Sequence, residues 1–285
     1  MNSGLISKIQ RYSTKDGPGL RSTAFLVGCN MKCVWCSNPE LIGEGVKILH
    51  HPQLCVHCGA CTALSGGAIT FGEEGCMIDR ERCGNLAECA AACYYDAYET
   101  VGYTVSPEEL ADWLSRDKAF YDMSGGGVTF SGGEPALQAE FVIETARILR
   151  RSGIRVAVDT AGSVPWERLG PLAFEADLIL YDIKAFDANI HLTCTGEDNR
   201  IILENAQKLA EAGKDMIIRM IVAPGYNDQR EDIKARRSFA AALGPCVRKV
   251  EVLKLHHLGE SKYRSLGITY PLKKADTKSG PDEIA

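Results

Sequence analysis

The sequence predicts an α/β fold in which helices cover a parallel sheet and a small cysteine-rich segment interrupts the chain. Six apolar strand segments alternate with helical segments, and this alternation is typical of a parallel sheet with helices outside it. Seven of the twelve cysteines lie between residues 51 and 99. At 285 residues the chain suits one large domain, or one domain with an insert.

The strands and helices can be placed in order from apolar runs and turn residues. The first strand is apolar on both faces, as a parallel strand should be. Ser106, Pro107 and Glu109 form a capping box with proline at the favoured first position, which predicts a helix to about Ser115. Strands are expected at 22–28, 128–130, 154–160, 177–183, 216–223 and 249–256, with further helices after Pro135 and near 165–174, 199–212 and 231–243.

Composition excludes several classes of protein. The net charge is −5 and there is no basic tract, so nucleic-acid binding is not expected. The N-terminus has no apolar core of a signal peptide, and no apolar run approaches membrane-spanning length. The expected location is the cytoplasm, where clustered cysteines indicate metal ligands rather than disulfides.

Three cysteines follow the first strand in the pattern C-x3-C-x2-C: Cys29, Cys33 and Cys36. A four-iron cluster is normally held by four thiolates, so three in one loop leave one iron open. An open coordination position is what metal catalysis needs. A zinc loop or three buried thiols would be the alternatives.

This loop resembles the signature of the radical S-adenosylmethionine (SAM) enzymes. The resemblance implies that the open iron binds the methionine part of SAM and that one electron cleaves SAM to methionine and a 5′-deoxyadenosyl radical. It places Trp35 near the adenine, although packing over the cluster would also explain this residue. Gly132, Gly133 and Glu134 resemble the family's G-G-E motif, which binds the SAM amino group. By itself that motif is also an ordinary strand-to-helix turn.

A turn of sequence Asp16-Gly17-Pro18-Gly19 precedes the first strand. Together with the cysteine motif it resembles the activating enzymes of glycyl radical enzymes, of the glycerol dehydratase, choline lyase and arylacetate decarboxylase activase type. The resemblance implies a partial (β/α)6 TIM-like barrel. It also implies that the turn lies beside the place where the partner presents its glycine.

Polar residues at the strand ends should face the site, because chemistry in such barrels lies at the carboxyl ends of the strands. A buried carboxylate needs a partner, and no basic residue is evident between Asp159 and Asp182. The resemblance implies a monovalent cation, Na⁺ or K⁺, held by Asp159, Thr160, Leu180 and Asp182. It assigns SAM-contacting or substrate-side positions to Lys184, Arg219 and His257. Salt bridges, or a satisfied core histidine, are the alternatives.

The segment 51–99 resembles a ferredoxin-like insert, with the barrel in 1–50 and 100–285. A four-thiolate set for one auxiliary [4Fe–4S] cluster is complete, whereas positions 65 and 86 of a second set are Ser65 and Leu86. We therefore expect a firm first cluster and an absent or atypical second one, for which Cys76 is a substitute ligand. A zinc-binding insert is the alternative. The first set is Cys55, Cys58, Cys61 and Cys93, and the second retains Cys83 and Cys89.

The predicted function is a radical SAM activase that abstracts a glycine Cα hydrogen from a partner enzyme. The expected partners are a glycyl radical enzyme and a flavodoxin- or ferredoxin-type reductant, for a monomeric protein of an anaerobic bacterium. A radical SAM enzyme acting on a small molecule or peptide, and an electron-transfer iron–sulfur protein, are the alternatives. Near the C-terminus, 281–283 resemble the start of the helix that closes these barrels.

Overall fold

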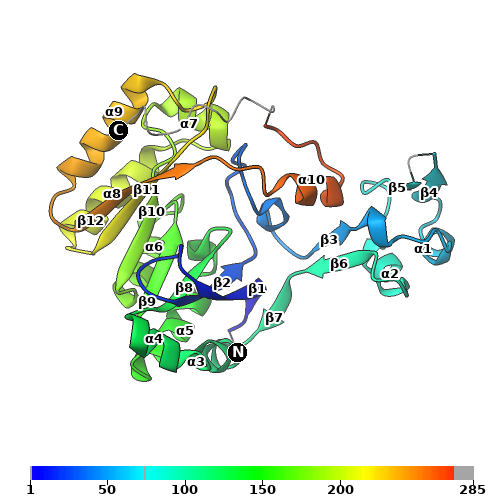
Figure 1. The fold of residues 1–285 in the computed structure, drawn as a ribbon, viewed down its shortest axis with the longest axis horizontal. Coiled ribbons are helices and arrows are strands. Elements are labelled where there is room, and N and C mark those ends of the chain that lie inside the picture. The colour runs from blue at the N-terminus through cyan, green and yellow to red at the C-terminus, as the bar shows by residue number, and fades with distance from the viewer. Residues whose placement is uncertain (1, 74, 273–285) are drawn as a thin grey trace.

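The computed structural model describes residues 2–73 and 75–272. Its centre is an eight-stranded sheet with the strand order β12-β11-β10-β9-β8-β2-β1-β7 (Figure 1). Six neighbouring strands in this order are parallel, as predicted. They are β2 (Arg21–Leu26), β8 (Gly127–Gly132), β9 (Val156–Thr160), β10 (Leu178–Asp182), β11 (Met216–Val222) and β12 (Val247–Lys254).

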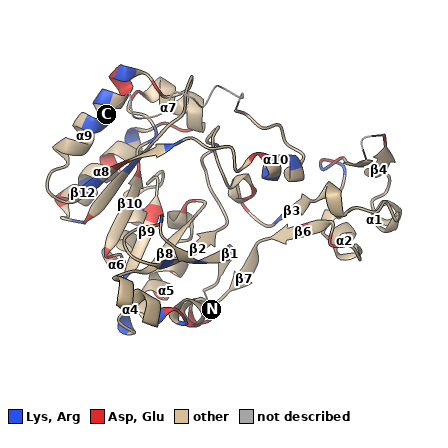
Figure 2. Cartoon of the chain, viewed as in Figure 1, with Lys and Arg blue, Asp and Glu red and all other residues tan. Residues whose placement is uncertain are grey.

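Helices follow the parallel strands and cover the sheet from outside, which confirms the predicted α/β alternation. The outer helix α9 displays much of the basic charge on this side of the barrel (Figure 2). The helices of the barrel are α3 (Pro107–Ser115), α4 (Lys118–Ser124), α5 (Ala139–Arg151), α6 (Trp166–Glu175), α7 (Ala188–Thr195), α8 (Arg200–Glu211), α9 (Arg230–Ala242) and α10 (Glu260–Leu266).

The helix beginning at Pro107 has the predicted capping box. The Ser106 hydroxyl accepts from the Glu109 amide, and the Glu109 carboxylate accepts from the Ser106 amide. The helix expected directly after Pro135 starts later, because Glu134 caps a 3₁₀ turn, η3 (Pro135–Gln138), before α5 begins. A second 3₁₀ turn, η1 (Pro39–Leu41), follows the cysteine loop.

Two antiparallel strands, β1 (Gly4–Ser13) and β7 (Tyr103–Val105), extend the sheet beyond β2 and were not predicted. β1 is half polar and mostly accessible beyond Ile6, so it shows no clean alternation of apolar and polar residues. Its strand conformation comes from pairing with β2 rather than from its own composition.

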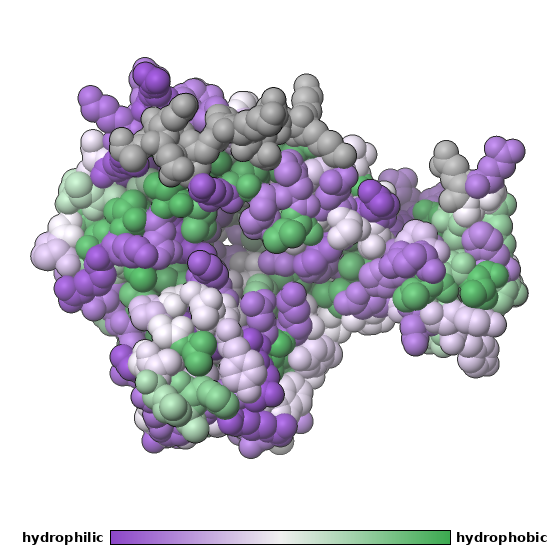
Figure 3. Space-filling model, viewed as in Figure 1, coloured by the Kyte–Doolittle hydropathy of each residue, from purple (hydrophilic) through white to green (hydrophobic). Residues whose placement is uncertain are grey.

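Residues 47–101 leave the barrel as a separate lobe on a two-stranded stalk (Figure 1). The stalk consists of β3 (Lys47–His50) and β6 (Tyr98–Val101), which pair antiparallel. Hydrophobic side chains gather on the lobe's surface in the space-filling view (Figure 3). Val56 and Met77 are among the large hydrophobic residues of the lobe that are exposed. The lobe contains η2 (Pro52–Leu54), α1 (Ala60–Leu64), β4 (Ile69–Gly72), β5 (Gly75–Ile78) and α2 (Leu86–Ala91).

Within the described residues, no helix is long and apolar enough to cross a bilayer. The C-terminal segment at 281–283 lies outside the described residues, so the expected closing helix is not tested.

Candidate active site

The cysteine loop leaves the end of β2 and is tied to the neighbouring parts of the barrel. The Lys32 amide donates to the Thr195 carbonyl at 2.7 Å, and the Val34 amide donates to the Cys194 carbonyl at 2.9 Å. The Asn30 side chain donates to the Ser163 carbonyl at 2.7 Å. The end of α7 and the loop after β9 therefore hold the cysteines in place.

The far side of the loop is fastened to the following segment. Cys29 and Gly43 exchange backbone hydrogen bonds of 3.3 and 2.8 Å. The Lys262 ammonium of α10 donates to Asn38 at 2.7 Å and pairs with Glu40, which is almost completely buried. Because the Glu40 carboxylate is buried, this salt bridge holds the segment that follows the cysteine loop against α10. Neither partner belongs to the cysteine motif.

Burial would keep the three thiols of the cysteine loop protonated as long as no positive ion is present. Burial raises the pKa of Cys29 and of Cys36 to about 12, and it also raises the pKa of Cys33. Each thiol interacts electrostatically with at least one other cysteine or with Lys184. An iron–sulfur cluster would replace three protons at this position, and the donors present fit such a group.

The two glycines of the G-G-E motif let β8 approach the cysteine loop. Gly132 has φ +108°, and a Cβ on Gly133 would lie 1.9 Å from the Gly28 carbonyl oxygen. The next amide, of Glu134, donates to the same carbonyl at 2.7 Å. The motif therefore has a packing role that stands beside the predicted SAM contact.

Glu134 is 2% exposed, and its carboxylate accepts three hydrogen bonds from protein donors, two of them on one oxygen. It accepts from the Thr160 hydroxyl at 2.6 Å, from the Ala161 amide at 3.0 Å and from the Ala136 amide at 3.1 Å. Burial raises the pKa of Glu134, and these hydrogen bonds oppose the shift. Of the predicted cation ligands, Thr160 thus uses its side chain to orient Glu134.

The expectation that Asp159 and Asp182 lack basic partners is wrong. Arg219 Nη1 lies 3.0 Å from Asp159, and Lys184 Nζ lies 2.8 Å from Asp182. Asp159 also accepts from the Ser131 hydroxyl at 2.8 Å. Asp159 raises the pKa of Arg219, so this guanidinium stays charged. Although burial opposes the charge of Lys184, Asp182 raises its pKa.

The Asp16 turn precedes β2, yet its carboxylate reaches the same group of charges. Asp16 accepts from the Ser13 hydroxyl at 2.6 Å and from the Thr23 hydroxyl at 2.7 Å. It interacts electrostatically with both Asp159 and Arg219. The Asp16 carbonyl also accepts from the Thr129 hydroxyl at 2.7 Å, so the predicted partner-facing turn is hydrogen-bonded to β8, the strand whose Ser131 donates to Asp159.

Gly17 and Gly19 shape this turn. Their φ values are +117° and +73°, and a Cβ on Gly19 would lie 2.4 Å from the backbone nitrogen of Gly126. Buried Arg21 donates to the Pro18 carbonyl at 3.4 Å. The turn is consequently packed against the start of β8 rather than projecting into solvent.

Trp35 and His257 each contact other residues of this chain, and these contacts could not be predicted from the sequence. Trp35 is buried in an apolar cluster with Cys194, Ala223 and Leu272, so the packing role is present whatever the ligand. His257 Nδ1 lies 2.8 Å from the Tyr270 hydroxyl. A contact of either residue with SAM stays a prediction.

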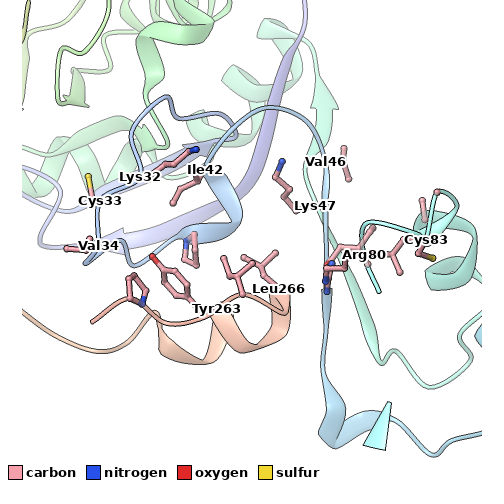
Figure 4. Close-up of a pocket in the computed structure, with 17 residues that line it drawn as sticks. Lys32, Cys33, Val34, Ile42, Val46, Lys47, Arg80, Cys83, Tyr263 and Leu266 are labelled. Atoms are coloured by element: carbon pink, nitrogen blue, oxygen red, sulfur yellow. The ribbon is translucent and has the colours of Figure 1, made fainter. Parts of the chain in front are cut away.

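A pocket of about 700 Å³ extends from the cysteine loop to the lobe (Figure 4). Cys33 and Val34 line one end, Cys83 lines the other, and Tyr263 and Leu266 of α10 lie between them. The cysteine loop and the lobe thus face one mostly apolar space.

In the lobe, the four cysteines predicted for the first auxiliary cluster line one small cavity: Cys55, Cys58, Cys61 and Cys93. The second set is different. Ser65 uses its hydroxyl to accept from the Ile69 amide at 3.0 Å and to donate to the Thr62 carbonyl at 3.1 Å. Leu86 packs in an apolar cluster.

The remaining thiols of the second set form a pair. Cys83 and Cys89 both donate to the Asn85 side-chain oxygen, at 3.7 and 3.8 Å. Cys76 packs against the apolar cluster that contains this pair, and its sulfur lies within 4.8 Å of ligand atoms of Cys55 and His50. His50 was not singled out from the sequence, since a lone histidine at a strand end carries no motif.

Comparison with known proteins gives the family. The family model described as the Radical SAM superfamily matches residues 23–236. The (2S)-3-sulfopropanediol dehydratase activating enzyme of Klebsiella oxytoca is 37% identical over 277 residues, covering 95% of this chain and 87% of that protein. The isethionate sulfite-lyase activating enzyme of Desulfovibrio desulfuricans is 39% identical, covering 94% and 88%.

The benzylsuccinate synthase activating enzyme of Thauera aromatica is 36% identical over 278 residues, covering 94% of this chain and 83% of that protein. Similarity of this extent to several activating enzymes, with the cysteine loop at the end of β2, decides the assignment. The chain belongs to the radical SAM superfamily and, within it, to the activating enzymes of glycyl radical enzymes.

Proposed function

We propose that this protein takes a hydrogen atom from a glycine Cα of a partner enzyme and leaves a stored glycyl radical there. The observation that carries the proposal is that β8 is bonded to both the Asp16 turn and β9: its Thr129 hydroxyl donates to the Asp16 carbonyl at 2.7 Å, and its Ser131 hydroxyl donates to Asp159 at 2.8 Å. In this arrangement the turn assigned to the partner's glycine borders the strand ends assigned to SAM.

Each group of residues has a definite task in this proposal. Cys29, Cys33 and Cys36 would hold the four-iron cluster, which supplies the electron for SAM cleavage when bound. Glu134, fixed by Thr160 and its neighbours, presents a buried negative charge for the SAM ammonium group. Trp35, Lys184, Arg219 and His257 would line the rest of the SAM and substrate space, with Gly132 and Gly133 bringing β8 close to the cysteine loop.

The function is tested by incubating the reduced holoenzyme with SAM and a candidate glycyl radical enzyme without oxygen. A glycyl-radical doublet in the electron paramagnetic resonance spectrum is expected, together with 5′-deoxyadenosine. A partner whose radical-bearing glycine is replaced by alanine is the matched control and should give no doublet. SAM cleavage without a doublet across a panel of glycyl radical enzymes would favour a small-molecule or peptide substrate instead.

The partner's own substrate is left open. Relatives at 36 to 39% identity are named for a dehydratase, a sulfite-lyase and a synthase, so similarity to the activating enzyme does not select among them. We place the protein in the cytoplasm of an anaerobic bacterium as a monomer, reduced by a flavodoxin or ferredoxin.

A monovalent cation near Asp159 and Asp182 is also part of the proposal. Asp16, Asp159 and Asp182 all interact with Arg219, and Lys184 is the second basic residue of this group. Glu251, which lies 4.0 Å from Arg219, is itself paired with Lys249 at 2.8 Å. The other three carboxylates face two basic side chains, and one Na⁺ or K⁺, with the Thr160 and Leu180 carbonyls as further ligands, would balance the charge.

Replacing Na⁺ and K⁺ with a bulky tetraalkylammonium ion is expected to raise the SAM concentration needed for half-maximal cleavage. Asp182→Asn should raise it too and should remove the dependence on the small cation, because one ligand and one charge are gone. Exposed Asp198→Asn is the control and should behave as wild type. An unchanged SAM requirement without either small cation would refute the site.

For the lobe we propose a ferredoxin-like insert at 51–99 with one auxiliary [4Fe–4S] cluster on Cys55, Cys58, Cys61 and Cys93. Their shared cavity supports this set. The bonded hydroxyl of Ser65 and the packed side chain of Leu86 support the absence of a second cluster at Cys83 and Cys89.

A further inference from the structure

We propose that His50, Cys55 and Cys76 form a second kind of metal site in the lobe, for a single borderline-soft divalent ion of the zinc class. It is separate in chemistry from the auxiliary cluster, although the two ligand sets share Cys55. The lobe can therefore hold either a four-iron cluster or one ion at this thiolate.

The first support is the convergence of three ligand atoms from three segments. His50 ends β3, Cys55 follows η2 and Cys76 lies in β5. One ligand atom of each lies within 4.8 Å of the others. Zinc binds thiolate at about 2.3 Å and imidazole at about 2.0–2.1 Å, so a small inward movement brings these three onto one ion.

The second support is the unsatisfied state of His50. The residue is 5% exposed, and its Nε2 has no hydrogen-bond partner among the described residues. A buried polar atom without a partner lowers the stability of the fold. The ring is also restrained by Tyr98, whose centroid lies 5.0 Å away. A metal ion would satisfy this nitrogen.

The donor set favours one ion over a cluster at this position. One imidazole and two thiolates are ligands typical of zinc. The cavity of the proposed iron–sulfur set includes Cys58, Cys61 and Cys93 but neither His50 nor Cys76.

Binding would change both the lobe and its chemistry. The ion would displace the thiol protons of Cys55 and Cys76, while His50 binds as the neutral ring. It would join the stalk to the β4–β5 hairpin. Cys55 would be a ligand of either the single ion or the auxiliary cluster. An ion bound here would therefore keep the auxiliary cluster from assembling.

The test uses full-length apoprotein carrying Cys29→Ala, Cys33→Ala and Cys36→Ala, so that the cysteine loop does not contribute. Co²⁺ serves as a spectroscopic probe and is then displaced by Zn²⁺. The parent should show thiolate-to-cobalt absorption, and its zinc form should show nitrogen and sulfur neighbours in X-ray absorption. In this background, His50→Gln and Cys76→Ser should each weaken binding at least tenfold.

Cys58→Ser and Cys93→Ser are the matched controls, since they remove cluster ligands and leave the proposed ion site intact. They should bind Co²⁺ like the parent, while His50→Gln and Cys76→Ser should still assemble about four irons on reconstitution. Zinc added first should prevent that assembly in the parent and not in His50→Gln. Parent-like Co²⁺ binding by both His50→Gln and Cys76→Ser, with melting curves showing a folded chain, would overturn the proposal. Equal loss of binding in Cys58→Ser and Cys93→Ser would do the same.

Discussion

Replacing Cys33 with alanine is expected to abolish SAM cleavage and to remove one four-iron cluster from the protein. Cys33 is the middle ligand of the loop, and it interacts with Lys184 and Asp182 at the strand ends. With two thiolates left in the loop, a cubane would have two open irons and would not be retained. The readouts are 5′-deoxyadenosine formation and iron content after anaerobic reconstitution.

Cys194→Ala is the matched control for this loss. Cys194 is buried beside the cysteine loop, and its backbone carbonyl accepts a hydrogen bond from the Val34 amide of that loop. The substitution leaves that hydrogen bond in place, so cluster and activity should be kept. Full activity in Cys33→Ala would contradict the assignment of the catalytic cluster.

The same iron measurement counts the clusters in the lobe. If each cluster has four irons, wild type should hold about eight per chain and Cys33→Ala about four. About twelve in wild type and eight in the variant would show two auxiliary clusters. Cys83 and Cys89 would then need two further ligands, and the packed Leu86 would have to move.

Arg236→Ala is expected to lower the free energy of unfolding by about 3–5 kcal/mol, because it breaks a completely buried ion pair. Arg236 is 0% exposed, and its Nε lies 2.8 Å from Asp232. Its other nitrogens donate to the Lys184, Ile221 and Asn227 carbonyls at 3.3, 3.0 and 2.6 Å. The truncation leaves the buried Asp232 carboxylate without its counter-ion and the Asn227 carbonyl without the guanidinium donor, whereas the Lys184 and Ile221 carbonyls keep the Asn227 side chain as a donor.

The damage should extend to the site, because this pair holds the segment after β10. Asp232 accepts from the Phe186 and Asp187 amides at 2.8 and 2.7 Å, and Lys184 lies two residues before Phe186. Chemical denaturation measures the stability loss, and SAM binding to the folded fraction measures the displacement of Lys184. Exposed Arg237→Ala on the same helix is the control. A loss equal to that of the control would show that the buried pair does not contribute.

The parts of the site that the sequence predicts are those encoded within one short stretch. The spacing of Cys29, Cys33 and Cys36 places three thiols in one loop without knowledge of any other segment. The capping box at Ser106 and Glu109 is equally local. These features depend only on the spacing of residues along the chain. That spacing stays the same wherever the fold places the stretch.

Contacts between distant strands were beyond such reasoning. Arg219 lies opposite Asp182 in the β10–β11 register, yet it pairs with Asp159 of β9. Which carboxylate it binds depends on strand twist and side-chain direction, neither of which the residue pattern contains. The Thr160–Glu134 hydrogen bond likewise requires β9 to lie beside β8. β1 was not predicted because its strand conformation comes from pairing with β2. Its own sequence has no clear alternation of apolar and polar residues.

The stalk of the lobe has a consequence for how such proteins diversify. Lys47 pairs with Val101 and His50 pairs with Tyr98, so the chain departs and returns at one point on the barrel. Recombination where the stalk joins the barrel can add, exchange or delete the whole lobe as one segment. The parallel strands of the barrel keep their register in each case. Activating enzymes with different lobes can therefore share one barrel.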